Sequence, residues 1–148
     1  MKMTRIIALV LALVTMLAAS AALAAPFFGG NYQYVAPEDF KKWLEAGKKV
    51  QIVDIQVPAE FQQHHFKGAL QTNAFPVKSA EEKSKLDRVL PQLTATREEI
   101  VIICPRGGGG AKNTYDHLKS KGIAEARMHI LEDGMQGWPY QALVVQGK

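Results

Sequence analysis

The sequence predicts an α/β fold in which a parallel β-sheet carries helices on both of its faces. Residues 100–103 (IVII) are consecutive apolar residues without polar alternation, a pattern typical of a strand buried on both faces. Ala111, Tyr115 and Leu118 are spaced at i, i+4 and i+7, as on one face of a helix. Successive strand–helix units of this kind run along the chain, and they favour a parallel sheet with right-handed crossovers.

The first half of the chain supplies the elements before the central strand. Residues 32–35 predict a short edge strand, and a helix opens at Pro37, whose ring suits a first helical turn. Residues 50–55 predict a second buried strand, 58–65 a short helix, and 68–75 a third, shorter strand.

The second half supplies the remaining helices and the last strand. Residues 81–93 predict one amphipathic helix, with apolar side chains recurring at threes and fours and charges opposite them. The helix that opens near Ala111 is expected to end at Gly122, a residue that favours the position after a helix. Residues 127–131 predict the last strand, and 134–140 predict a turn beside the carboxyl edge of the sheet.

The N-terminal segment has the pattern of a secretion signal in residues 1–24. Lys2 and Arg5 precede an apolar stretch at 6–19, and residues 22–24 (ALA) then give the small-x-small pattern of a cleavage site. The stretch is shorter than the roughly 20 residues that a membrane-spanning helix needs. We therefore expect cleavage after Ala24, no membrane span in the mature chain, and a location in the bacterial periplasm or outside the cell.

The remainder predicts a short N-terminal extension at 25–35 and one domain at 36–148. Without Lys2 and Arg5, 16 basic residues stand against 14 acidic ones, a net charge of +2, so we expect no nucleic-acid partner. Cys104 is the only cysteine. It cannot form an internal disulfide, and a lone thiol in an oxidising compartment favours a functional role.

Cys104 is the candidate nucleophile because it directly follows the central strand. The carboxyl edge of an open α/β sheet is where such folds bind ligands. A loop of Pro105, Arg106 and a run of glycines separates Cys104 from the next helix. The glycines that we predict to bind substrate, together with Arg106, are Gly107, Gly108, Gly109 and Gly110.

This loop is expected to hold a sulfur anion on Cys104, either a thiolate or a persulfide. Glycines allow the backbone to turn successive N–H groups inward, and the helix N-terminus adds a partial positive charge. Arg106 adds a full charge if its side chain folds toward the loop. The alternative is a flexible surface loop beside an inert thiol. The order of strand, cysteine, glycines and helix favours the functional interpretation.

Spacing excludes two other loops that bind phosphate. An ATP-binding P-loop needs G-x-x-x-x-G-K-[ST], but Ala111 precedes Lys112 and Asn113 follows it. The active-site loops of cysteine phosphatases and arsenate reductases have the pattern C-x5-R. Here the sixth residue after Cys104 is Gly110 instead of arginine. Without that arginine, phosphate-ester chemistry would lack its main charge partner.

No metal or other cofactor is predicted. His64 and His65 are adjacent, so on a helix their side chains would point about 100° apart and could not chelate one ion from the same face. No cysteine or further histidine lies at zinc spacing. We expect His65 to bond nearby backbone instead.

Two further residues are predicted to support the site. Asp54 lies inside the strand at 50–55. It could act as a general base, but hydrogen bonding to backbone N–H groups is the favoured role because buried charges are normally paired. Trp138 could wall the loop of Cys104 or simply pack in the core, and both interpretations stay open.

Four segments in a fixed order resemble the rhodanese family. Residues 53–56 (VDIQ), followed by 58–61 (PAEF), are similar to the family's VDVR strand end. Residues 65–70 (HFKGAL) are similar to HIPGAI, Cys104 heads the active loop, and 131–138 (LEDGMQGW) are similar to the closing LxGGMxGW. The resemblance implies a rhodanese-like parallel sheet with helices on both faces.

The same resemblance implies a sulfurtransferase that carries sulfane sulfur as a persulfide on Cys104. The donor would be thiosulfate or a polysulfide, and the acceptor a thiol or a protein. This sequence departs from the family pattern at two positions, and each departure removes a positive charge near the site. The arginine usual in the family's loop would fall at Gly109, whereas this chain has Arg106 three residues earlier. Gln56 stands where the family usually has another arginine. These changes favour a polysulfide or protein persulfide over thiosulfate.

Two other functions are compatible with the same residues. The chain could be a sulfur carrier or sensor that does not turn over and docks on a sulfur-metabolising partner. It could also be an inactive scaffold, although the intact Cys104 argues against that.

Overall fold

The structure, a computed structural model, describes residues 31–147. The signal predicted at 1–24 lies outside the described residues. Within 31–147, no helix is long and apolar enough to cross a membrane.

A five-stranded sheet in the order β1-β6-β5-β2-β4 forms the centre, and every neighbouring pair in it is parallel. The predicted parallel sheet is therefore confirmed, and the predicted edge strand is β1. The strands are β1 Tyr34–Val35, β2 Val50–Asp54, β4 Leu70–Gln71, β5 Glu99–Ile103 and β6 Met128–Leu131.

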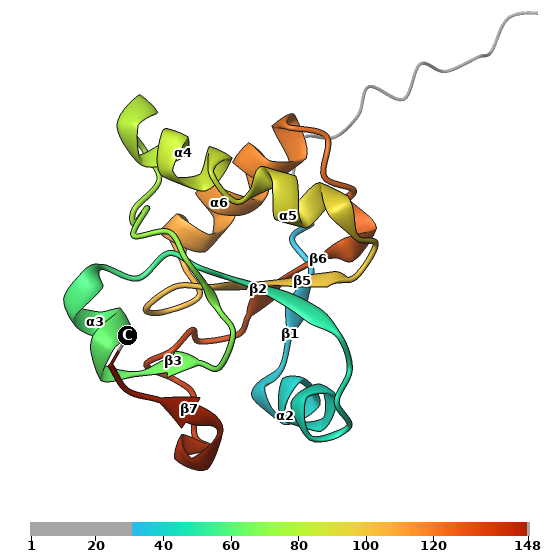
Figure 1. Cartoon of the computed structure of the whole chain (residues 1–148), viewed down its shortest axis with the longest axis vertical. Helices are drawn as coiled ribbons and strands as arrows, with labels where there is room; N and C mark the ends of the chain where they lie inside the picture. Colours follow the sequence, from blue (N-terminus) through green and yellow to red (C-terminus); the bar gives the residue numbers. More distant parts are fainter. Residues whose placement is uncertain (1–30, 148) are drawn as a thin grey trace, which may run out of the picture. The chain divides into compact units, whose positions relative to one another are not determined.

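Helices cover both faces of this sheet, as predicted (Figure 1). One face carries α2, and the other carries α4, α5 and α6. The helices are α2 Pro37–Glu45, α3 Pro58–Gln63, α4 Ala80–Asp87, α5 Leu90–Ala95 and α6 Gly109–Ser120, with short 3-10 helices η1 Glu125–Arg127 and η2 Gln141–Leu143.

The middle strand β5 has both of its faces buried. Ile100 and Ile102 join the core under α4 and α6, whereas Val101 and Ile103 join the core under α2. Alternate side chains of a strand point to opposite faces, so an unbroken apolar run is the sequence that two buried faces require. The chain leaves β5 at Cys104, which is 2% exposed.

The helix predicted over 81–93 is instead two helices, α4 and α5, so that prediction was wrong. Pro91 lies in the first turn of α5. Proline has no N–H to donate to the carbonyl of Asp87, and its ring collides with that carbonyl in a continuous helix. The apolar spacing of the segment is kept, because Leu86 and Leu93 are both fully buried.

Two other boundaries differ from prediction for local reasons. The strand expected at 68–75 is reduced to β4 because Asn73 adopts a φ of 54° and turns the chain out of the sheet. The helix expected at 58–65 ends at Gln63. His65–Phe66 forms β3, which pairs antiparallel with β7 Val144–Val145 in a second, two-stranded sheet that the sequence pattern did not predict.

Helix α4 begins with a capping box that fixes the segment before it. The Ser79 hydroxyl accepts the Glu82 N–H at 3.1 Å, and the Glu82 carboxylate accepts the Ser79 N–H at 3.0 Å. The same carboxylate accepts the Lys78 N–H at 2.6 Å. These bonds satisfy backbone donors that a helix start otherwise leaves free.

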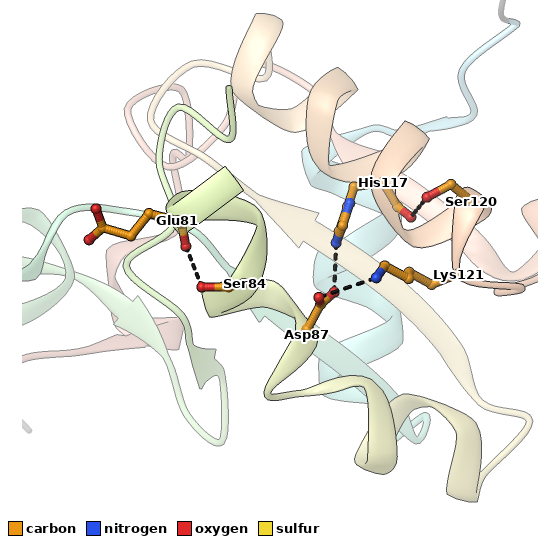
Figure 2. A network of polar contacts seen from close by, with 6 residues as sticks. All are labelled: Glu81, Ser84, Asp87, His117, Ser120 and Lys121. Atoms are coloured by element: carbon orange, nitrogen blue, oxygen red, sulfur yellow. Dashed lines mark hydrogen bonds and ion pairs between the residues drawn. The ribbon is translucent and has the colours of Figure 1, made fainter. Parts of the chain in front are cut away.

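We predict that Ser79→Ala lowers the free energy of unfolding by about 1 kcal/mol, the usual cost of losing such a cap. Urea unfolding of the purified chain measures this. Ser84→Ala is the matched control, since the Ser84 hydroxyl only donates to the Glu81 carbonyl one turn earlier (Figure 2). Equal losses in the two variants would contradict the cap.

Candidate functional site

The Cys104 thiol lies at the start of a tight loop after β5. Its Sγ atom accepts the backbone N–H of Gly107 at 2.9 Å. Gly107 has a φ of 67°, and a Cβ atom there would lie 2.9 Å from the Leu131 carbonyl oxygen. Only glycine tolerates both that conformation and that approach. The loop therefore directs one N–H donor at the sulfur, as the glycine run predicted.

Two backbone hydrogen bonds fasten this loop to the segment that follows β6. Met135 N–H donates to the Cys104 carbonyl at 2.9 Å, and Gln136 N–H donates to the Pro105 carbonyl at 2.9 Å. Gly134 lies between the two backbones with a φ of 61°, and a Cβ atom there would collide with the Cys104 carbonyl oxygen. The carbonyl groups thus point away from the sulfur.

A pocket of about 200 Å³ opens beside Cys104. It brings together Cys104, Arg106, Gly108, Gly109 and Gly110, whereas Gly107 donates to the sulfur without lining the pocket. Four further lining residues were not singled out from the sequence: Phe75, Pro76, Lys78 and Pro105.

The N-terminus of α6 faces this pocket with free donors. Helix α6 begins at Gly109, with Gly108 as its N-cap and no side chain capping it. Among the described residues, the N–H groups of Gly108, Gly109 and Gly110 have no hydrogen-bond acceptor. Free N–H groups and the helix dipole together favour an anion at this end of a helix.

The glycines of the loop have different structural reasons to be glycine. A Cβ on Gly110 would lie 2.9 Å from ring carbons of Phe75, so its absence lets the ring close one wall of the pocket. A Cβ on Gly108 or Gly109 would meet no atom within 4 Å, because the side of these residues toward the pocket is open. Close packing thus fixes the ends of the loop and leaves its middle accessible.

Two cationic side chains line the pocket. Arg106 was predicted; it is exposed, and it makes no side-chain hydrogen bond or ion pair within residues 31–147. Lys78 reaches the pocket from the segment between β4 and α4. No sequence motif marked Lys78, because its position depends on how that segment folds back over α6.

The family model of the rhodanese-like domain matches residues 36–140. The chain belongs to the rhodanese-like domain family. A comparison with curated protein sequences gives no significant match.

Solved structures with the same fold carry different chemistries. A Pseudomonas aeruginosa thiosulfate sulfurtransferase is 19% identical, with a TM-score of 0.59 over 78% of this chain and 20% of that one. A Staphylococcus aureus rhodanese-like domain protein is 22% identical, with a TM-score of 0.55 over 78% and 99%. An As/Sb reductase from Leishmania major is 17% identical, with a TM-score of 0.58 over 78% and 86%. These identities establish the fold alone.

Asp54 ends β2 in this rhodanese-like domain and is fully buried. Its carboxylate accepts the Gln56 N–H at 2.9 Å and the Gln56 side-chain amide at 3.0 Å. Burial raises the pKa of Asp54 to about 7, although the two Gln56 bonds oppose the rise. Asp54 does not line the pocket. These contacts describe the structural role that the sequence favoured.

Gln56 joins Asp54 to the end of α3, because its amide also donates to the His64 carbonyl at 3.1 Å. Gln56, which stands where the resemblance to the family implies an arginine, is therefore a buried neutral side chain, 3% exposed. It completes the hydrogen bonds of the carboxylate without adding charge.

Trp138 lies in the core under α2 and does not line the pocket beside Cys104. It is 2% exposed, packs edge to face with Phe40 and Phe66, and donates its indole N–H to the Tyr140 carbonyl at 2.9 Å. Of the two interpretations of Trp138, these contacts fit packing.

His65 bonds the Phe61 carbonyl at 2.8 Å through Nδ1, as expected. Within residues 31–147, no cluster of histidine, cysteine and carboxylate side chains has the arrangement of a metal site.

We predict that Gly134→Ala lowers the free energy of unfolding by about 2–5 kcal/mol, because a side chain there adds left-handed strain and a backbone collision. Gly109→Ala is the control: it lies at the start of α6 with no atom within 4 Å of its Cβ position. Urea unfolding of both variants provides the measurement. A tolerated Gly134→Ala would show that the loop is not fastened there.

We also predict that Gln56→Leu destabilises the domain by about 1–3 kcal/mol near pH 8 and by less near pH 5. The raised pKa of Asp54 means that stability from its bound proton is lost as pH rises through about 7. The Gln56 side-chain amide, which this substitution removes, favours the charged carboxylate, so its loss matters most above that pH. Urea unfolding at both pH values, with exposed Gln63→Leu as control, checks this. A pH-independent loss would contradict it.

Proposed function

We propose that this rhodanese-like domain is a sulfurtransferase that carries sulfane sulfur as a persulfide on Cys104. The observation that carries the proposal is the Gly107 N–H, which donates to Cys104 Sγ at 2.9 Å beside the unpaired N–H groups of α6. Donors fixed around a sulfur stabilise its anion, and the thiolate is the nucleophilic form of cysteine.

The reaction would proceed in two displacements at sulfur. The Cys104 thiolate attacks the sulfane sulfur of thiosulfate or of a polysulfide; the donor's S–S bond breaks, and sulfite or a shorter polysulfide leaves with the electron pair. A thiol or another thiophilic acceptor then attacks the outer sulfur of the persulfide. The Cys104–sulfur bond breaks, and the thiolate is restored.

The open middle of the loop suits this exchange. Gly108 and Gly109 leave space beside Cys104, so a second sulfur atom can extend from Sγ toward the free N–H groups of α6. Those groups would hold a negatively charged outer sulfur without a loop arginine.

The alternative is a carrier or sensor that takes up one sulfur and releases it only to a docked partner. The observation that favours it is the exposure of Arg106, which leaves the pocket without a buried cation for a small dianion such as thiosulfate. We propose a periplasmic or secreted location for either function, because residues 1–24 have the pattern of a cleaved signal.

We predict that brief exposure to polysulfide adds the mass of whole sulfur atoms to the intact protein and that a reducing thiol removes them. Cys104→Ser should gain no mass, since its hydroxyl cannot form a persulfide. Intact-protein mass spectrometry measures both. An unchanged mass for the wild-type chain would refute sulfur transfer.

Steady-state assays then separate enzyme from carrier. Repeated turnover with thiosulfate and cyanide supports the enzyme, whereas release of one equivalent followed by a stop supports the carrier. In the second case, the next round of release should require the partner protein.

A further inference from the structure

A second, larger hollow lies beside the Cys104 pocket, between α4 and α6. Its volume is about 460 Å³, compared with about 200 Å³ for the pocket, and we call it the α4–α6 groove. Lys78 lines both spaces and stands where they meet. The groove continues along Lys83 on α4 and along Asn113, His117 and Ser120 on α6.

The backbone before α4 holds Lys78 at this junction. Val77 is 1% exposed and has a φ of 62°, a rare conformation for a β-branched residue. Its N–H donates to the Ala74 carbonyl at 2.8 Å, and the Asn113 amide donates to the Pro76 carbonyl at 3.1 Å. Unfavourable backbone persists only where its surroundings fix it, and it is often found at functional sites.

The groove has two ammonium groups available to a ligand. Among the residues that the structure describes, Lys78 and Lys83 form no ion pair. Within residues 31–147, Asp116 is the one carboxylate in the groove's lining, and it accepts the Tyr32 hydroxyl at 2.9 Å. Because that hydroxyl is neutral, the lining sets two lysines against one carboxylate.

Asp87, the last residue of α4, makes two side-chain contacts with α6 and the residue after it. It accepts His117 Nε2 at 2.7 Å and Lys121 Nζ at 3.2 Å (Figure 2). The first of these contacts ties the His117 side chain to α4. With two lysines and one carboxylate in its lining, the groove presents a net positive charge to a small molecule, and Lys78 is the residue that it shares with the Cys104 pocket.

We propose that the α4–α6 groove binds the anionic tail of a small organic thiol, or of its persulfide, whose sulfur reaches Cys104 past Lys78. This proposal rests on the proposed sulfur transfer and names the substrate class for it. The pocket suffices for an inorganic sulfur anion. The groove has the size typical of sites for small organic molecules, and Lys78 and Lys83 would bind a carboxylate there.

The transfer balances without an oxidant or a reductant. The thiolate of the small molecule attacks the outer sulfur of the Cys104 persulfide and forms a new S–S bond. The bond between that sulfur and Cys104 Sγ breaks, and its electron pair returns to Cys104 as the thiolate. The product is the persulfide anion of the small thiol.

The test compares two acceptor thiols of different charge on persulfide-loaded protein. Mercaptosuccinate carries carboxylates, and 2-mercaptoethanol is neutral. We expect Lys78→Ala and Lys83→Ala each to lower the second-order rate with mercaptosuccinate about two- to fivefold at low salt, the range for exposed ion pairs. The rate with 2-mercaptoethanol should stay unchanged in Lys83→Ala; in Lys78→Ala, whose side chain also lines the pocket, it should fall by less than the rate with mercaptosuccinate, and salt should reduce the difference.

Lys49→Ala is the control for the loss of one positive charge. Lys49 is exposed and directly precedes β2, at the edge of the sheet opposite Cys104. If both thiols slow equally in Lys78→Ala and Lys83→Ala, the lysines shape the loop and the proposal is overturned. It is also overturned if neither rate changes, or if Lys49→Ala has the same selective effect.

A binding measurement separates this proposal from the proposed function. S-methylmercaptosuccinate keeps the carboxylates and cannot accept sulfur. In a titration of the purified chain followed by NMR, it should shift the amide signals of Lys78, Lys83 and Asn113, and Lys78→Ala should weaken its binding. Shifts in a protein that takes up no sulfur would refute the transfer but keep the groove. No shifts in a protein that loads sulfur would refute the groove alone.

Discussion

The structure depends above all on the two backbone hydrogen bonds that join the loop of Cys104 to the chain after β6. Met135 and Gln136 occupy the carbonyls of Cys104 and Pro105 at 2.9 Å. Those two carbonyls point toward the segment after β6. The N–H groups of the loop therefore remain on the side of the sulfur. A loop that was free to rotate would present carbonyl oxygens as often as N–H groups, and oxygens repel a sulfur anion. The direction of two ordinary bonds therefore decides the charge environment of the thiol.

Neutral donors replace formal charge throughout this site. Gln56 satisfies the buried Asp54 carboxylate where the family usually has an arginine, and the loop has Gly109 where an arginine usually lies. A buried carboxylate without a cation keeps a raised pKa, and the pKa of Asp54 is raised to about 7. The formal positive charges are displaced to the surface, on Arg106 and Lys78 at the mouth of the pocket. Such charges select ligands at entry more than they stabilise a buried intermediate.

Local pattern was sufficient to predict the sheet, its buried middle strand and the position of Cys104. Residues 100–103 encode burial on both faces, and in the glycine run after Cys104 the first and last glycines, Gly107 and Gly110, lie where a side chain would collide with its neighbours. Pro91 also indicated that the helix predicted over 81–93 would be interrupted. The helical spacing of apolar residues on both sides of Pro91 nevertheless favoured one continuous helix. Strand β3 and its pairing with β7 were not predictable from local pattern, because each is two residues long and stable only against the other.

Lys78 shows why part of the site could not be derived from sequence. Its neighbour Val77 is a residue type that favours β-strands. Here the Val77 side chain is buried in the core while its backbone has a left-handed conformation. Asn113, on an element far along the chain, holds the adjoining Pro76 carbonyl. The position of Lys78 therefore depends on the contact between Asn113 and Pro76, two residues that no sequence motif or periodicity connects. Because that contact fixes the segment before α4, it also fixes the backbone of Lys78, the residue that lines both the pocket and the groove.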